Sequence, residues 1–117
     1  MATRPEEIHS FLEEFKVKLN VWGVVFRDDR GKNTQALFDL DITRNDRIAL
    51  LKKLVKEDYS EGPLKEKLNY GADMWVFGKE LKGKEIYIKI AMGVSGTQVI
   101  CISFHLAEFK MNYPLKK

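Results

Sequence analysis

The sequence alternates strictly between polar and apolar side chains in Glu85-Ile86-Tyr87-Ile88-Lys89-Ile90, and again in Val99-Ile100-Cys101-Ile102-Ser103-Phe104-His105. Because successive side chains of a strand point to opposite faces of a sheet, this alternation predicts two half-buried strands. One face of both strands is hydrocarbon and should face the core. The other face carries a phenol, an ammonium group, a hydroxyl and an imidazole, which makes it the candidate functional surface.

Further strands are indicated on either side of this pair. Residues 74–81 predict a strand that leads into a turn at Lys82-Gly83, and Gly93–Gly96 predicts the turn between the two alternating strands. A short β-branched and aromatic run, Val21–Phe26, predicts another strand. Residues 58–73 break all periodicity and predict a long loop.

Helices are expected in the first half of the chain. Apolar residues at helical spacing predict one helix over 5–18 and a second over 44–57, the latter capped by Thr43. Residues 34–40 fit a short helix or a short strand, and Asp28–Asn33 predicts a turn. This order predicts a single α+β domain over 1–117, with N-terminal helices packed on an antiparallel sheet of three to five strands.

Composition narrows the class of protein. The chain has 117 residues, 44% hydrophobic and 32% charged, with a net charge of +3. This mildly basic balance permits a nucleic-acid partner without requiring one, and the basic run Lys52–Lys56 predicts only a solvated helix face.

The cysteine content bears on the cellular compartment. Cys101 is the only cysteine, which suggests a reducing compartment. With no apolar leader at the N-terminus and no apolar run long enough to span a bilayer, we expect a cytoplasmic protein without a membrane partner.

The residues that share the polar face follow from pairing the isoleucine rows. If Ile88 lies opposite Ile102, then Tyr87 lies opposite Ser103 and diagonal to His105. If the preceding strand pairs with Phe77 near Tyr87, its alternate residues join the same face. The predicted surface then consists of Trp75, Phe77, Lys79, Tyr87, Lys89, Ser103 and His105.

Such a surface suits single-stranded RNA, because rings stack bases and ammonium groups hold phosphates. It also suits RNA cleavage through the 2′-hydroxyl, which needs a base, an acid and positive charge but no metal or other cofactor. His105 and Tyr87 are the candidate proton carriers. Positive charge is available from Lys65, Lys67, Lys79 and Lys89. No spacing of histidine, cysteine and carboxylate residues predicts a metal site.

Two other interpretations fit the same residues. The first helix could cover Trp75 and Phe77, which would turn this face into a second core. Alternatively, the face could bind RNA or a protein without cutting it, as in a non-catalytic module, an antitoxin-like protein or an immunity protein.

The order of several features resembles the MqsR-type toxins, small bacterial endoribonucleases with a RelE-like fold. The features are Asp58-Tyr59 after a helix, a strand with Trp75, the Tyr87-x-Lys89 strand and Ser103-Phe104 near the C-terminus. The resemblance covers residues 50–105. It implies cleavage of single-stranded mRNA, free or ribosome-bound, without a cofactor, and neutralisation by an antitoxin protein.

The resemblance also implies roles for single residues. Tyr87 matches the family's active-site tyrosine and Lys89 the lysine beside it, and Tyr59 would lie near the RNA. The chain departs from the family pattern at Ser60, Val76 and His105, which replace a basic residue, a glutamine and a lysine. We hypothesise that His105 takes over proton transfer and that Lys79 supplies the missing charge.

Overall fold

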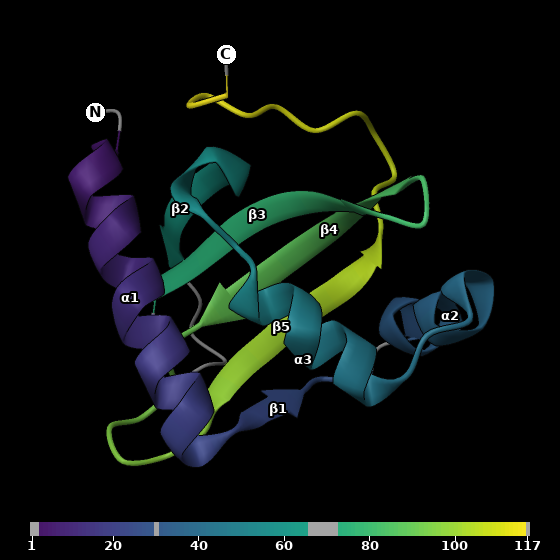
Figure 1. Cartoon of the computed structure of the whole chain (residues 1–117), viewed down its shortest axis with the longest axis horizontal. Coiled ribbons are helices and arrows are strands. Elements are labelled where there is room, and N and C mark those ends of the chain that lie inside the picture. Colours follow the sequence, from purple (N-terminus) through teal and green to yellow (C-terminus); the bar gives the residue numbers. More distant parts are fainter. Residues whose placement is uncertain (1–2, 30, 66–72, 117) are drawn as a thin grey trace.

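A computed structural model describes residues 3–29, 31–65 and 73–116 of the chain. In chain order these residues form α1 (Pro5–Trp22), β1 (Val24–Phe26), α2 (Gly31–Leu40), α3 (Arg44–Lys52), the 3₁₀ turn η1 (Lys56–Asp58), β2 (Tyr59–Lys65), β3 (Asp73–Leu81), β4 (Lys84–Ala91) and β5 (Val99–Leu106). The α+β class is therefore as predicted (Figure 1).

The strands form one sheet in the order β1-β5-β4-β3-β2. β2, β3, β4 and β5 are antiparallel neighbours, but β1 lies parallel to β5. The prediction of a purely antiparallel sheet is therefore wrong at this edge. The helices α2 and α3 separate β1 from the other strands in sequence, and so long a connection allows β1 to enter the sheet in the parallel direction.

Most differences between the predicted and the observed element boundaries lie near the helices. α1 continues to Trp22 and stops at Gly23, whose φ of +84° a helix cannot adopt, so the strand expected from Val21 starts only at Val24. Residues 31–40 are helical, so the predicted turn ends before Gly31. α3 ends at Lys52, earlier than expected.

The predicted cap at Thr43 is confirmed. Its hydroxyl accepts a hydrogen bond from the Asp46 N–H at 3.2 Å, and the Asp46 carboxylate accepts one from the Thr43 N–H at 2.8 Å. This reciprocal pair satisfies two backbone donors at the start of α3.

The loop predicted over 58–73 is wrong for its first half. Tyr59–Lys65 forms β2, which pairs with β3 and shifts register twice along its length. Those irregularities explain why no alternating pattern is visible in the sequence. Residues 66–72, including Lys67, lie outside the described residues.

α1 and α3 cover one face of the sheet (Figure 1). The main apolar cluster lies between them and the sheet, and Ile86, Ile88 and Ile90 contribute from β4 as predicted. α1 contributes Ile8, Leu12, Phe15 and Leu19, which repeat at helical spacing.

β3 faces the opposite way from the prediction. Phe77 pairs with Ile88 and Trp75 with Ile90, so both aromatic rings lie on the core face. The Phe11 ring of α1 stacks on Trp75, with ring centroids 4.6 Å apart. The first helix thus covers Trp75 and Phe77, which was the alternative interpretation of their role.

The register between β4 and β5 is shifted by two residues from the expected one. Ile88 lies opposite Phe104, not Ile102, and this brings Tyr87 directly opposite His105. A bulge beyond Lys89 lets Cys101 pair with Ile90 in the main core. Burial raises the pKa of the Cys101 thiol, so this residue is a packing residue of the sheet.

The same bulge moves Ile102 to the other face, where it forms a small second cluster with Met74 and Ala91. Alternation along β3 predicts Met74 on the core face when Trp75 and Phe77 lie on the polar face. That prediction is wrong, because Trp75 and Phe77 face the core and Met74 lies on the other side. Across residues 3–29, 31–65 and 73–116, none of the helices combines the length and the apolar character that a membrane span requires.

Candidate functional site

A pocket of about 820 Å³ opens on the sheet face opposite α1. Tyr87 and Lys89 of β4 and Ser103 and His105 of β5 line it. These are four of the seven side chains predicted to share a polar face. Alternation placed them together correctly because the isoleucines of β4 and Phe104 of β5 face the core, which turns these four side chains to the other face.

Three further segments form the walls of this pocket. They are the start of α2 (residues 31–33), the start of β2 (Ser60 and Glu61) and the C-terminal segment 108–112, which follows β5. The C-terminal segment is drawn in yellow in Figure 1. The pocket therefore combines segments that lie far apart in the sequence.

The rings of Tyr87 and His105 stack in this pocket. Their centroids are 5.2 Å apart and their planes differ by 14°. Lys89 lies on the same side of β4, with its Nζ 5.8 Å from the centroid of the Tyr87 ring. A phenol, an imidazole and an ammonium group therefore border the same space.

A contact with the backbone determines which nitrogen of the His105 ring bears the hydrogen. Nδ1 of His105 lies 2.9 Å from the carbonyl oxygen of Leu106. Because a carbonyl oxygen only accepts hydrogen bonds, Nδ1 carries the hydrogen in this contact. In the neutral ring, Nε2 is then the nitrogen that can accept a proton.

The Tyr87 hydroxyl is held in its protonated form. Partial burial raises the pKa of Tyr87, and the nearby carboxylate of Glu61 raises it further. At neutral pH this side chain is therefore a proton donor rather than a phenolate. The two stacked groups thus differ in chemistry: Tyr87 can give a proton and His105 can take one.

Asn33 fixes the helical wall of the pocket. β1 is too short to pair with all of β5, and the Asn33 side chain continues the pairing in place of a strand. Its amide nitrogen donates to the carbonyl oxygen of Ile102 at 2.9 Å, and its amide oxygen accepts from the Phe104 N–H at 2.9 Å. Asn33 also donates to the carbonyl oxygen of Arg27 at 3.0 Å, so one buried side chain joins α2, the segment after β1, and β5.

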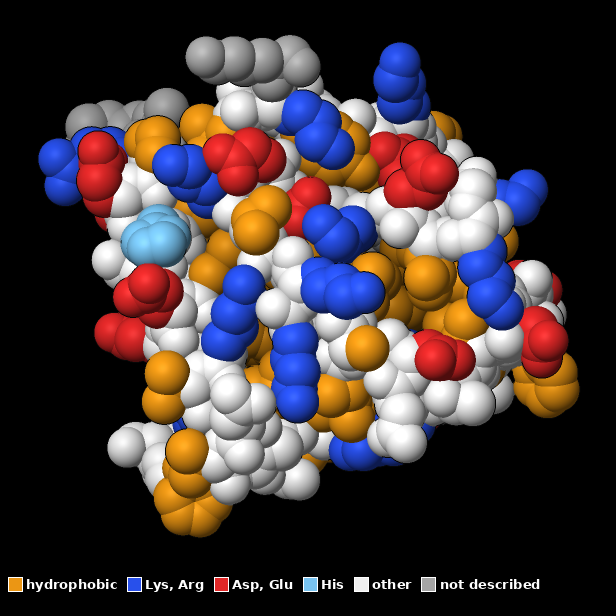
Figure 2. Space-filling model, viewed as in Figure 1, with side chains coloured by type: hydrophobic (Ala, Val, Ile, Leu, Met, Phe, Trp, Pro, Cys, Tyr) orange, Lys and Arg blue, Asp and Glu red, His pale blue; other side chains and the backbone are white. Residues whose placement is uncertain are grey.

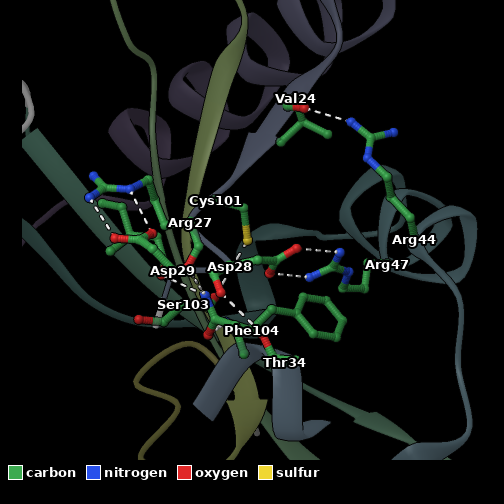
Figure 3. Close-up of polar contacts among 12 residues, drawn as sticks. Val24, Arg27, Asp28, Asp29, Thr34, Arg44, Arg47, Cys101, Ser103 and Phe104 are labelled. Carbon is green, nitrogen blue, oxygen red and sulfur yellow. Dashed lines mark hydrogen bonds and ion pairs between the residues drawn. The ribbon is translucent and has the colours of Figure 1, made fainter. Parts of the chain in front are cut away.

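A buried arginine supports the same region (Figure 3). Arg47 of α3 donates two hydrogen bonds to the Asp28 carboxylate, at 2.8 and 3.1 Å. Its guanidinium carbon lies 3.8 Å from the centroid of the Phe26 ring. These contacts hold the segment after β1, and with it the start of α2, against the helical layer.

Glu85 holds the C-terminal wall. Its backbone oxygen accepts from the Ala107 N–H at 2.9 Å, and its carboxylate accepts from the Met111 N–H at 3.1 Å and from the Tyr113 hydroxyl at 2.6 Å. Gly78 lies under this wall, where a Cβ atom would stand 2.3 Å from the Tyr113 hydroxyl oxygen. The absence of a side chain at Gly78 therefore lets the C-terminal segment lie close to the sheet.

An ion pair joins two walls of the pocket. Glu108 of the C-terminal segment contacts Lys32 of α2. Lys32 lowers the pKa of the Glu108 carboxyl, so Glu108 is ionised at neutral pH. The lining therefore carries both signs of charge, with Lys32, Lys89 and Lys110 against Glu61 and Glu108.

Lys79 does not belong to this pocket. It lies opposite Ile86 on the core side of β3, and its Nζ donates to the carboxylate of Asp58 at 2.9 Å. Its predicted position beside Tyr87 is wrong, because the register of β3 points it the other way. Its charge neutralises a carboxylate that is only 6% exposed.

The other predicted RNA contacts also lie elsewhere. Trp75 and Phe77 are buried under α1, and Tyr59 is buried against their edges while its hydroxyl donates to the carbonyl oxygen of Gly62. Lys65 is exposed on β2 and pairs with Asp73. The three aromatic residues therefore serve core packing, and Lys65 forms a local ion pair.

The sequence offered no signal for several pocket residues. Lys32, Glu61, Glu108 and Phe109 line the pocket but belong to segments without any alternating pattern. Only the tertiary fold brings them beside Tyr87. The described residues contain no group of three or more histidine, cysteine, aspartate or glutamate side chains placed to hold a metal ion.

The opposite face of the molecule has a different character. Lysine and arginine side chains lie along the middle of the helix-bearing face (Figure 2). Lys52, Lys53 and Lys56 are exposed and contribute to the basic run noted in the sequence. Positive charge alone therefore does not locate the site, and the convergence of Tyr87, Lys89 and His105 is the more specific signal.

Comparison with protein-family models, with curated proteins and with solved structures found no match.

Proposed function

We propose that this protein is a metal-independent endoribonuclease that cleaves single-stranded RNA at the Tyr87–His105 pocket. The observation that carries the proposal is the stacked pair itself, in which a protonated phenol and an imidazole with a fixed tautomer border one pocket. RNA cleavage through the 2′-hydroxyl needs such an acid and such a base, and no metal.

In the proposed step, Nε2 of His105 accepts the proton of the ribose 2′-hydroxyl. The 2′-oxygen then forms a bond to phosphorus while the bond from phosphorus to the 5′-oxygen breaks. The Tyr87 hydroxyl donates its proton to the departing 5′-oxygen. The products are an RNA with a 2′,3′-cyclic phosphate and an RNA with a free 5′-hydroxyl.

Lys89 and Ser103 support this step. They lie opposite each other on neighbouring strands, two residue pairs beyond Tyr87 and His105 and on the same face of the sheet. The ammonium group of Lys89 would stabilise the negative charge that builds up on the phosphate oxygens. The Ser103 hydroxyl would donate a hydrogen bond to one of the same oxygens.

The resemblance to MqsR-type toxins adds a biological setting to the proposal. In this setting the fold is a variant of the RelE-like fold, the protein acts on mRNA in the cytoplasm, and an antitoxin protein blocks it. The support is the match of Tyr87 and Lys89 to the family pattern, together with their place in an open pocket.

A non-catalytic binding module is the second candidate. Glu61 and Glu108 place two carboxylates in the lining, and these would repel an RNA phosphate. A mixed lining of this kind also suits a protein or peptide partner that carries both signs of charge.

Incubation of the purified protein with single-stranded RNA in EDTA separates the two candidates. We expect wild-type protein to cleave, and His105→Ala and Tyr87→Phe to lose about 100-fold or more of the rate, as is usual for removal of an acid or a base. His9→Ala is a matched control, since His9 is exposed on α1 and pairs with Glu13. Intact RNA, or equal cleavage by all variants, would reject the nuclease, and retention of intact RNA in a gel would favour the binding module.

A further inference from the structure

Phe109 occupies an unusual position on the rim of the pocket. Its side chain is 84% exposed, although it lines the same pocket as Tyr87 and His105. A single exposed aromatic residue is ordinary on a protein surface. What distinguishes Phe109 is that the backbone on both sides of it is fixed.

The fixation comes from Glu85 and Lys32. Two residues before Phe109, the Ala107 N–H donates to the Glu85 backbone, and two residues after it the Met111 N–H donates to the Glu85 carboxylate. The adjacent Glu108 is paired with Lys32 across the pocket. A short segment held in this way presents its central side chain to solvent at a defined place.

The surroundings of Phe109 match one class of ligand. Lys110 follows it in the chain, and Lys89 lies on the floor of the pocket. An aromatic face beside ammonium groups is the arrangement that binds single-stranded nucleic acid, because the ring stacks on a base while the cations hold the backbone. A phenyl ring has no hydrogen-bonding group, so it would accept any base.

We infer that Phe109 is a stacking platform for the base next to the phosphate that occupies the pocket. This inference rests on the proposed function, since it takes RNA as the ligand and adds the residue that positions it. Phe109 is therefore a positioning residue, and the reacting groups remain those of Tyr87 and His105.

Phe38 provides a matched control on the same protein. It is 78% exposed on α2 but does not line the pocket. Replacing either phenylalanine removes a similar exposed apolar surface from the folded protein. A general effect of surface hydrophobicity would therefore appear in both variants, and a stacking platform only in one.

The test measures equilibrium binding of a fluorescent single-stranded oligonucleotide that carries 2′-O-methyl groups and cannot be cleaved through the 2′-oxygen. We expect Phe109→Ala to weaken binding about tenfold, in line with the loss of one stacked base. Phe109→Trp should bind as tightly as wild type or more tightly, Phe109→Leu should resemble Phe109→Ala, and Phe38→Ala should not differ from wild type.

The outcomes separate this inference from the proposed function. Equal binding by Phe109→Ala and wild type, full binding by Phe109→Leu, or no binding by wild type would overturn the stacking platform. Binding that depends on an aromatic residue at 109, combined with no cleavage of ordinary RNA, would overturn the nuclease and leave the platform in place.

Discussion

The Tyr87 and His105 rings stack across neighbouring strands, 5.2 Å apart, because the two residues lie directly opposite each other in the register of β4 and β5. Opposed side chains on one face of an antiparallel pair are the closest neighbours that a sheet provides. The pair therefore owes its geometry to the strand register, and each ring limits the motion of the other.

The acidity of Tyr87 should respond to Glu61. Burial raises the pKa of Tyr87 most, and the Glu61 charge adds to it. We expect Glu61→Gln to lower the pKa of Tyr87 part of the way toward its ordinary value of about 10, because burial remains. Phenolate absorbance, measured as the difference between each protein and its Tyr87→Phe version, reports this change. An unchanged titration would show that Glu61 does not act on Tyr87.

The same shift makes stability depend on pH in the alkaline range. As pH rises through about 10, the unfolded chain loses the Tyr87 proton before the folded chain does. The free energy of unfolding should therefore fall above this pH and be unaffected by Tyr87 below it. Urea unfolding of wild type and Tyr87→Phe at pH 8 and pH 10.5 isolates the contribution of Tyr87.

Gly78→Ala should release the C-terminal wall of the pocket. The new methyl group would overlap the Tyr113 hydroxyl and the Met111 sulfur, which can move away because they are the ends of side chains. We expect faster proteolysis after residue 106 and a stability loss of about 1 kcal/mol, since the hydrogen bond of Tyr113 to Glu85 is lost.

Gly31→Ala is the matched control for this variant, because nothing lies within 4 Å of a Cβ atom built there. It should leave the proteolysis pattern unchanged. If Gly78→Ala is cleaved no faster than Gly31→Ala, the C-terminal segment is not held by its contact with the sheet.

Alternation predicted the pocket floor correctly for a definite physical reason. Ile86, Ile88 and Ile90 of β4 and Phe104 of β5 face the main core, and their burial brings Tyr87, Lys89, Ser103 and His105 to the other face. The exact register did not follow, since a shift by two residues keeps the same faces and only moves the partners.

β3 shows where this reasoning fails. Residues 74–77 are all apolar and all buried, because the strand packs on both of its faces. Such a run does not show which of its residues face the helices. The bulge at Ile102 and the path of residues 107–116 were equally invisible, because both depend on contacts between distant segments.

Lys79 gives a direct test of the corrected register. Lys79→Met should leave RNA cleavage unchanged, because Lys79 lies outside the pocket, but it should destabilise the protein by about 3 kcal/mol. The loss arises because Asp58 would be left as a buried charge without its cation. Adding Asp58→Asn should recover part of the stability. If Lys79→Met protein remains folded but loses most of its cleavage activity, Lys79 takes part in the site and its placement outside the pocket is wrong.

Asn33→Ala should be one of the most damaging single changes outside the apolar core. It leaves the Ile102 carbonyl and the Phe104 N–H without their partner in a buried place. We expect a loss of about 3 kcal/mol in the free energy of unfolding, measured in urea. Gln35→Ala on the same helix removes only an exposed hydrogen bond to Asp39 and should cost less than about 0.5 kcal/mol.

The central claim is that the 2′-hydroxyl of RNA is the nucleophile at the Tyr87–His105 pocket. The most direct measurement is the chemistry of the product ends after cleavage in EDTA, using one RNA and a copy with a single 2′-deoxy nucleotide at the cleaved position. We predict a 2′,3′-cyclic phosphate from the first RNA and no cleavage at that position of the second. His105→Ala should form the cyclic phosphate about 100-fold more slowly than wild type, or more slowly still. A 5′-phosphate at the cut, or equal cleavage of both RNAs, would contradict the account.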